Sequence, residues 1–286
     1  MPQSTRTSAR TTFRFASPPH AVIDACVLFS QTRRELLMHL ATKGLFQPLW
    51  SPEILDEASR NIVKRSEEKH ARDPAFVPIP LVKARGIFRI LDTYLPDAAQ
   101  PAPSARTIAR FRAVHWKDRH VVATALEAKL RAGFAATPAA QAHRKTQGVS
   151  PTSSPRFGVV TENLQDFPAK SLLAKRLFVG NTDAFVLSLL AWSGREVIGG
   201  ICAHMVGLQR PPLTLEEYVD KLAKADMHET RRVVEPTLLT IDATVRAAFA
   251  RATETSTAPT EGERRAEASM AAYRAAVEEA GALGLP

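Results

Sequence analysis

The chain has 286 residues, of which 45% are hydrophobic, so it is long enough to bury a substantial core in one large domain or one domain with appendages. Its two cysteines, Cys26 and Cys202, lie far apart and form no CxxC pair, which argues against a disulfide scaffold and a cysteine-based zinc site. The formal charge of +9 favours a polyanionic partner, such as nucleic acid or a membrane surface.

The N-terminal segment, residues 1–19, is polar and basic and contains no acid. It lacks the apolar core of a secretory signal, so we expect a disordered tail, with a transit peptide as the alternative. No apolar run approaches the roughly 18 residues that a membrane span requires. We therefore expect a cytoplasmic protein with no membrane partner.

Predicted strands and helices alternate between residues 20 and 180. The apolar run AVIDACVLF predicts a buried strand, with Asp24 at the end of AVID. Further strands are predicted over 45–50, 156–160 and 175–179, and helices over 31–43, 51–65, 78–92 and 117–130. This alternation is typical of a parallel sheet with helical crossovers.

Two segments differ from this pattern. Residues 131–157 are rich in Ala, Pro, Ser and Thr and contain basic residues but no acid, which predicts a mobile basic insertion. From Thr182 onward the sequence predicts helices. We therefore divide the chain into the tail, a domain over 20–210 that carries the insertion, and a C-terminal helical extension over 211–286.

Four acids from separate parts of the chain are predicted to meet at one edge of the sheet. Asp24 ends one strand, Asp166 follows another, and Asp118 opens a helix. Glu57 lies in the second turn of the helix that follows the strand over 45–50. Because ligands bind at the carboxyl ends of the strands in open α/β sheets, this edge is the candidate site.

Such a group of acids needs protonation or a cation. Two carboxylates about 4 Å apart repel by roughly 4 kcal/mol at an effective dielectric near 20. Mg²⁺ or Mn²⁺ prefers carboxylate and water oxygens, and it can activate a water and clamp phosphate oxygens. Structural alternatives stay open: Asp24 and Asp118 as caps, and Asp166 in an Asx turn. Periodicity alone places Glu57 on a polar helix face in solvent.

Four stretches carry these acids and resemble the bacterial PIN-domain proteins related to VapC-type toxins. They are DACVL, ILDEASRN, DRHVVATALEA and TENLQDFPA, in the order in which that family has them. The resemblance runs from about residue 21 to 222. It implies a three-layer α/β/α fold with a central parallel sheet, and a nuclease that acts on single-stranded RNA with Mg²⁺ or Mn²⁺. It further implies a toxin with a cognate antitoxin protein encoded alongside, and dimers are frequent among such proteins.

The resemblance assigns the acids by position. Asp24, Asp118 and Asp166 are expected to hold the metal. Glu57 is expected to bind the metal or to accept the proton of the attacking water, with Glu53 as the fallback for this position.

Other residues are assigned supporting roles. Asn163 is close enough to the fourth acid that the sequence does not separate the two, and Thr161 is expected to orient the water or a neighbouring carboxylate. Arg60, Arg33 and Arg34 are the candidate RNA-binding residues.

The sequence departs from the family in places. Trp116 stands where the family usually has a proline, and the basic insertion replaces a short connection, which puts the choice of substrate in question. We expect His115 and Trp116 to pack within their loop rather than to stack on a base. We expect His120 to lie on the surface, because residues two apart on a helix point to different faces. Cys26 is expected to be a small core residue.

The sequence therefore predicts a metal-dependent endoribonuclease. Two alternatives remain: a module with the same fold that binds RNA or a protein partner with little turnover, and a metal nuclease that acts on DNA.

Overall fold

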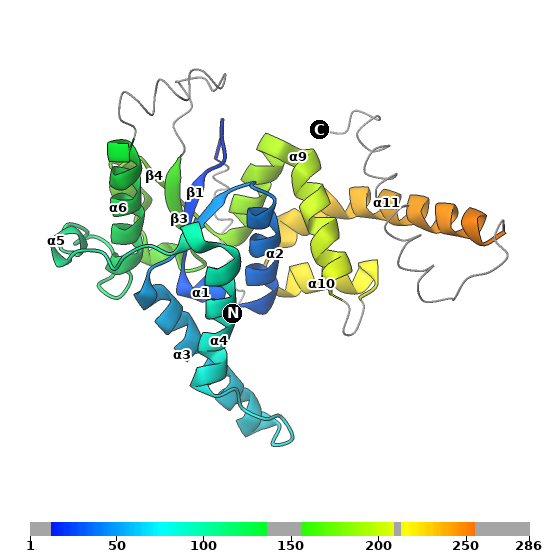
Figure 1. Cartoon of the computed structure of the whole chain (residues 1–286), viewed down its shortest axis with the longest axis horizontal. Coiled ribbons are helices and arrows are strands. Elements are labelled where there is room, and N and C mark those ends of the chain that lie inside the picture. The colour runs from blue at the N-terminus through cyan, green and yellow to red at the C-terminus, as the bar shows by residue number, and fades with distance from the viewer. Residues whose placement is uncertain (1–12, 136–155, 209–212, 255–286) are drawn as a thin grey trace, which may run out of the picture. The chain divides into compact units, whose positions relative to one another are not determined.

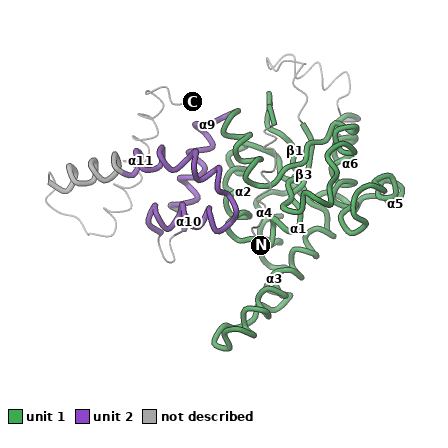
Figure 2. Tube along the Cα trace, turned by 180° about the vertical axis from the view of Figure 1, so that it is seen from behind, with its two compact units in different colours: residues 1–192 green, residues 193–286 purple. Residues whose placement is uncertain are grey.

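The computed structural model describes residues 13–135, 156–208 and 213–254 (Figure 1). The chain divides into two compact units, residues 1–192 and 193–286 (Figure 2). The division lies earlier than the boundary at residue 210 that the sequence predicted. It falls inside the long helix α9 (Thr182–Gly207), at Ser193, where the backbone leaves helical geometry with φ −145° and ψ 58°.

A four-stranded, all-parallel sheet forms the centre of the first unit, which confirms the predicted α/β class and parallel sheet. Its strands are β1 (His20–Ile23), β2 (Gln47–Leu49), β3 (Phe157–Val160) and β4 (Leu177–Gly180), in the order β2-β1-β3-β4. Pro48 is tolerated because β2 is an edge strand. β1 is shorter than the apolar run AVIDACVLF because the helix α1 (Ala25–Leu28) begins directly after Asp24.

Helices flank this sheet. They are α1, α2 (Gln31–Thr42), α3 (Pro52–Arg72), α4 (Leu81–Tyr94), α5 (Ala105–Ile108), α6 (Arg119–Ala135), α8 (Ala169–Leu173) and the start of α9, with 3-10 turns η1 (Pro96–Ala98) and η2 (Leu164–Asp166). The connection through α2 leads from β1 to β2, and the one through α6 leads to β3 on the other side of β1. Right-handed crossovers in opposite directions place their helices on opposite faces, as Figure 1 shows for α2 and α6. The strand order therefore reverses between β1 and β3.

The helix α3 begins as the sequence predicted. Ser51 is its N-cap residue in an extended conformation, and Pro52 stands at its first position, where a missing N–H has no cost. Ile54, Ala58 and Ile62 form a buried stripe at i, i+4 and i+8. The residues beside this stripe, Glu57 among them, are consequently held at the margin between core and solvent.

The expected disordered tail ends earlier than residue 19. Residues 1–12 lie outside the described residues, but Phe13 and Phe15 are buried, with ring centroids 5.0 and 5.6 Å from that of Phe178 on β4. The main-chain N–H of Phe13 also donates to Ser188 Oγ at 2.9 Å. The prediction was wrong here because two aromatic residues among polar ones produce no periodic pattern.

The basic insertion was predicted too long at both ends. Residues 131–135 continue α6, and Phe157 opens β3. Arg131 pairs with Glu127 at 3.6 Å, because residues four apart are neighbours on the surface of a helix. Residues 136–155 of the predicted insertion lie outside the described residues.

The second unit is helical, as predicted for the C-terminal extension. It holds the end of α9, α10 (Leu215–Lys224) and α11 (His228–Glu254). A capping box opens α10, because Thr214 Oγ1 accepts from the main chain of Glu217 while the Glu217 carboxylate accepts from the main chain of Thr214. In this unit Tyr218 and His204 are buried and lie 2.9 Å apart, from Nδ1 to the hydroxyl.

Among the described residues, one helix is long and apolar enough to cross a membrane by these two criteria alone. It is the stretch Thr182–Met205 of α9, with a mean hydropathy of 1.3, and 44% of its most apolar window is buried within the protein. Core helices of soluble proteins satisfy the same criteria, so this is weak evidence for a membrane span.

Candidate metal centre

Asp24 and Thr161 directly follow β1 and β3 and lie side by side at the carboxyl edge of the sheet. The last paired residues are Ile23 and Val160, and the main-chain N–H of Asp24 extends the ladder by donating to the Val160 carbonyl at 3.0 Å. Thr161 Oγ1 donates to Asp24 Oδ2 at 2.6 Å. The strand order reverses at this point, which is where open α/β sheets bind their ligands.

The carboxylate of Asp24 is fixed by three donors and is only 4% exposed. Besides the Thr161 hydroxyl, the main-chain N–H of Ala25 donates to Oδ1 at 2.7 Å and Cys26 Sγ donates to Oδ2 at 3.1 Å. Burial and the neighbouring Asp24 raise the pKa of the Cys26 thiol, so the thiol keeps the proton that it donates. We expected Cys26 to be a small core residue on a strand. Instead it lies on α1 and donates a hydrogen bond to Asp24.

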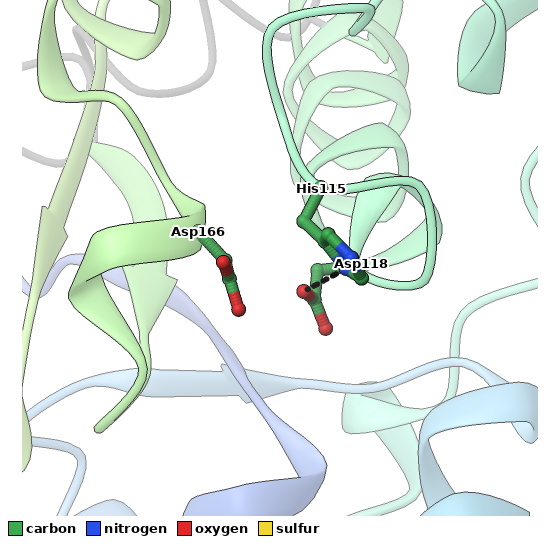
Figure 3. Close-up of side chains that lie close together, drawn as sticks. All are labelled: His115, Asp118 and Asp166. Atoms are coloured by element: carbon green, nitrogen blue, oxygen red, sulfur yellow. Dashed lines mark ion pairs between the residues drawn. The ribbon is translucent and has the colours of Figure 1, made fainter.

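Two further acids approach from separate turns. Asp118 lies in the turn before α6 and Asp166 in η2 after β3, and their side chains face a common space together with His115 (Figure 3). His115 Nδ1 is 3.4 Å from Asp118 Oδ2, and one ligand atom from each of the three residues lies within 4.8 Å of the other two. The main-chain N–H of His115 donates to the Asp166 carbonyl at 3.2 Å, which joins the two turns. The sequence did not identify His115 as part of the site.

Asn163 and Asp166 make different contacts in the structure, whereas the sequence did not distinguish between them. The Asn163 side-chain amide donates to Asp166 Oδ2, and its main-chain N–H donates to Thr161 Oγ1 at 3.1 Å. Asp166 is the one that interacts electrostatically with Asp118. Asn163 therefore orients the acid, and Asp166 contributes the charge.

Glu57 joins this group from α3. Burial raises the pKa of the Glu57 carboxyl, repulsion from Asp24 and Asp118 raises it further, and His120 and Arg60 partly offset the rise. Its side chain is 37% exposed, so it lies at the rim.

Asp118 has a raised pKa for the same reasons. Burial contributes first, followed by repulsion from Asp24 and Asp166, while His115 and His120 act in the opposite direction. The four acids Asp24, Glu57, Asp118 and Asp166, which we call the carboxylate cluster, are thus linked by unfavourable interactions between their negative charges.

His120 faces the carboxylate cluster, although we expected it on the surface. Its side chain is 15% exposed, and its Nε2 lies 3.8 Å from Glu57 Oε2 with no hydrogen-bond partner among the described residues. Its Nδ1 is 2.7 Å from the Lys117 carbonyl, which can only accept, so Nδ1 carries a hydrogen. The prediction was wrong because α6 begins at Arg119, so Asp118 precedes the helix and the helical-wheel rule does not relate the two.

Two predicted residues lie on the exposed side of α3. Glu53 is exposed in the first turn, whereas Glu57, one turn later, interacts with the aspartates. Arg60 is exposed and pairs with Asp56, and its charge also acts on Glu57. Arg60 is thus a cation beside the carboxylate cluster that remains accessible to a phosphate.

Arg33 and Arg34 are buried, so the structure does not support their predicted contact with RNA. Arg34 donates from Nη1 to the Leu28 carbonyl at 2.7 Å, and burial lowers the pKa of its guanidinium. Arg33 Nε lies 3.5 Å from Glu162 Oε1. The sequence did not predict the burial of these two residues, because arginine side chains are usually exposed.

No family model, curated protein or solved structure matched the chain. The side chains themselves fit a hard divalent cation. Carboxylate oxygens are the ligand atoms that Mg²⁺ and Mn²⁺ prefer. Burial and repulsion together raise the pKa of Glu57 and Asp118, and the repulsion is what a bound cation relieves. His115 offers a nitrogen ligand beside two of these carboxylates.

Proposed function

We propose that the chain is a Mg²⁺- or Mn²⁺-dependent endoribonuclease of the PIN type that hydrolyses phosphodiester bonds of single-stranded RNA. The observation that carries the proposal is the meeting of four acids at the point where the strand order reverses, where burial and repulsion raise the pKa of Glu57 and Asp118. The four motifs that resemble PIN-domain proteins, in the family's order, support the same assignment.

The acids have separate roles in this proposal. Asp24, Asp118 and Asp166 hold the cation, which when bound would activate a water and offset negative charge on the phosphate. Glu57 accepts the proton of the attacking water, because it is the acid at the rim of the carboxylate cluster and its raised pKa makes it a better base. The water attacks in line and leaves a 5′-phosphate and a 3′-hydroxyl.

Neighbouring side chains keep these acids in place. Thr161 and Cys26 direct hydrogen bonds at Asp24, and Asn163 does so at Asp166. His120 lies beside Glu57, with Nε2 3.8 Å from Oε2, and in this proposal it positions the Glu57 carboxylate. Exposed cations such as Arg60, together with the net charge of +9, attract the RNA backbone.

The proposal is tested by digestion of end-labelled single-stranded RNA and DNA with Mn²⁺, and with EDTA in its place. We expect RNA to be cleaved by the wild-type chain, and not in EDTA or by Asp118→Asn. Asp118→Asn is a cleaner test than Asp24→Asn, because Asp24 also accepts three hydrogen bonds that hold the end of β1 and the start of α1.

Each outcome of the digestion has a definite meaning. Cleavage that survives EDTA or Asp118→Asn contradicts the metal mechanism. Cleavage of DNA alone leaves the metal mechanism standing and contradicts the RNA assignment. Binding of RNA without cleavage under any divalent ion contradicts the enzyme and favours a binding module.

A further inference from the structure

Trp116 exposes a large aromatic ring in the loop that also carries His115 and Asp118. It lies in the turn between α5 and α6, and its side chain is 67% exposed. Trp50, by contrast, is buried as large aromatic residues usually are: it is 1% exposed, and its ring nitrogen donates to Asp92 Oδ1 at 2.8 Å. Within the loop the ring approaches that of His115, with centroids 5.9 Å apart, so the packing that we expected is present but leaves most of the Trp116 ring exposed.

The turn that carries Trp116 is held by hydrogen bonds along its main chain. Arg119 donates from Nε to the Val114 carbonyl at 3.0 Å and from Nη2 to the Arg112 carbonyl at 3.1 Å. The main-chain N–H of Asp118 donates to the His115 carbonyl at 2.9 Å. A ring presented on a fixed backbone loses little conformational entropy on binding, which favours a binding role over a freely moving side chain.

The turn that carries the ring also carries two exposed cations. Lys117 Nζ lies 5.4 Å from the Trp116 ring centroid, and Arg112 in the same turn is exposed. An aromatic face with cations beside it matches a nucleotide, in which a planar base is joined to a phosphate. Trp116 is two residues from Asp118, so their Cα atoms are at most about 7 Å apart.

We propose that Trp116 stacks on a base of single-stranded nucleic acid, while Lys117 contacts the neighbouring phosphate. This inference rests on the proposed function for one point only, which is that the phosphodiester next to the stacked nucleotide is the one at the carboxylate cluster. The interaction selects single strands, because bases inside a duplex offer no free face.

The test measures binding of labelled short oligoadenylates to the full chain by fluorescence anisotropy in EDTA, with intact ligand verified on a gel. We expect Trp116→Ala to weaken binding by about 5- to 150-fold, the range measured when an aromatic that stacks on one base is replaced by alanine. Trp116→Phe keeps an aromatic face and should retain most of the affinity. Tyr94→Ala is the matched control, since Tyr94 is 74% exposed on α4 and should bind as wild type.

A second ligand separates stacking from support of the turn. An oligonucleotide in which abasic positions replace the bases cannot stack, so Trp116→Ala should bind it as well as wild type does. Lys117→Ala should weaken both ligands alike and reduce the salt dependence of binding, with a slope lower by about 1. Ribose and deoxyribose versions of each ligand show whether the contact also discriminates between RNA and DNA.

Three results overturn the inference. The first is wild-type affinity of Trp116→Ala for oligoadenylate, and the second is an equal loss for the abasic ligand. The third is capture of a protein partner by Trp116 without any effect on nucleotide binding. Because binding is measured without divalent ions, a chain that stacks bases but never cleaves RNA would fail the proposed function and still support the stacking.

Discussion

Two neighbouring residues of α3, Asp56 and Glu57, show how differently one helix can use its acids. Asp56 Oδ1 accepts from Arg85 at 2.6 Å, and Arg60 pairs with its other oxygen; the Arg85 hydrogen bond is the main cause of a lowered pKa for this carboxyl. Glu57, one residue later, has a raised pKa through burial and the charges of Asp24 and Asp118. The first acid is stabilised by its partners, and the second is held beside groups that repel it.

The difference distinguishes an acid that is ion-paired on a helix surface from acids that fit the proposed site. An ion-paired acid on a helix surface needs no further explanation. Acids that repel one another at the ligand-binding edge of a sheet reduce stability, and proteins keep such arrangements where a ligand compensates for them. Substitutions in the carboxylate cluster and at Asp56 test whether the two acids of α3 differ in this way.

The largest effect is expected for Asp118→Asn, measured by initial rates of RNA cleavage in Mn²⁺. The rate should fall about 100-fold or more, because a bound cation stabilises the transition state by several kcal/mol. Asp56→Asn, which removes an equal charge from the ion-paired face, should cleave at the wild-type rate. Equal losses in the two variants would show that both acids act only through the net charge or the fold.

The next effect is expected for His120→Ala. Removal of the ring that faces Glu57 Oε2 should lower kcat about 10- to 100-fold, as is usual for groups that orient metal-site residues. KM for RNA should stay unchanged, because His120 is not expected to touch the substrate. His120→Gln, which can still place a polar atom toward Glu57, should recover part of the rate, and a change in KM alone would contradict the positioning role.

Polar residues at the strand ends could be placed from the sequence more directly than those on the helices. Asp24 and Thr161 follow strands, and parallel pairing alone places their main chains side by side. Glu57 was assigned to the site by the motif resemblance, because the helical wheel predicted a side chain in solvent. It lies beside the buried stripe of α3, and the packing of this helix brings its carboxylate under the influence of Asp24.

Other misses share a cause, which is that they depend on where an element begins. His120 was placed on the surface because Asp118 was assumed to belong to the helix, but α6 starts at Arg119. Phe13 and Phe15 were assigned to a tail because nothing in the local sequence reports the aromatic residue Phe178 on a distant strand. Boundaries of this kind are decided by tertiary contacts, which single-sequence patterns do not contain.

Metal binding and pH should change the stability by a smaller amount, which thermal unfolding in EDTA or in Mn²⁺ measures. The folded-state pKa values of Glu57 and Asp118 are raised, so these groups contribute stability that is fully present below their unfolded values of about 4. That contribution is lost as the pH rises through the raised folded values. In EDTA the midpoint should therefore fall over this window, and Glu57→Gln should reduce the fall.

Divalent metal should reverse this loss above the same window. At ten times its dissociation constant, Mn²⁺ should stabilise the wild-type chain by about 1.4 kcal/mol, and less when the carboxyls are protonated near pH 4. Calorimetric titration at neutral pH supplies the dissociation constant. If Mn²⁺ did not change the midpoint temperature of unfolding at any pH, this would contradict a cation site in the carboxylate cluster.

The smallest effect is expected for Asp56→Ala, measured as the free energy of unfolding at low and high salt. The loss should be below about 1 kcal/mol and should shrink with salt, because the pair with Arg60 and Arg85 is partly exposed. Its pH dependence has the opposite sign to that of Glu57: the pKa of Asp56 is lowered, so its contribution is present above the unfolded value of about 3.9 and is lost as the pH falls through the folded one. Wild-type minus Asp56→Ala stability should thus rise with pH up to about 4, whereas wild-type minus Glu57→Gln stability should fall as the pH rises above about 4. If both differences changed with pH in the same direction, Glu57 would be ion-paired like its neighbour, and only the repulsion of Asp118 by Asp24 and Asp166 would be left for a cation to relieve.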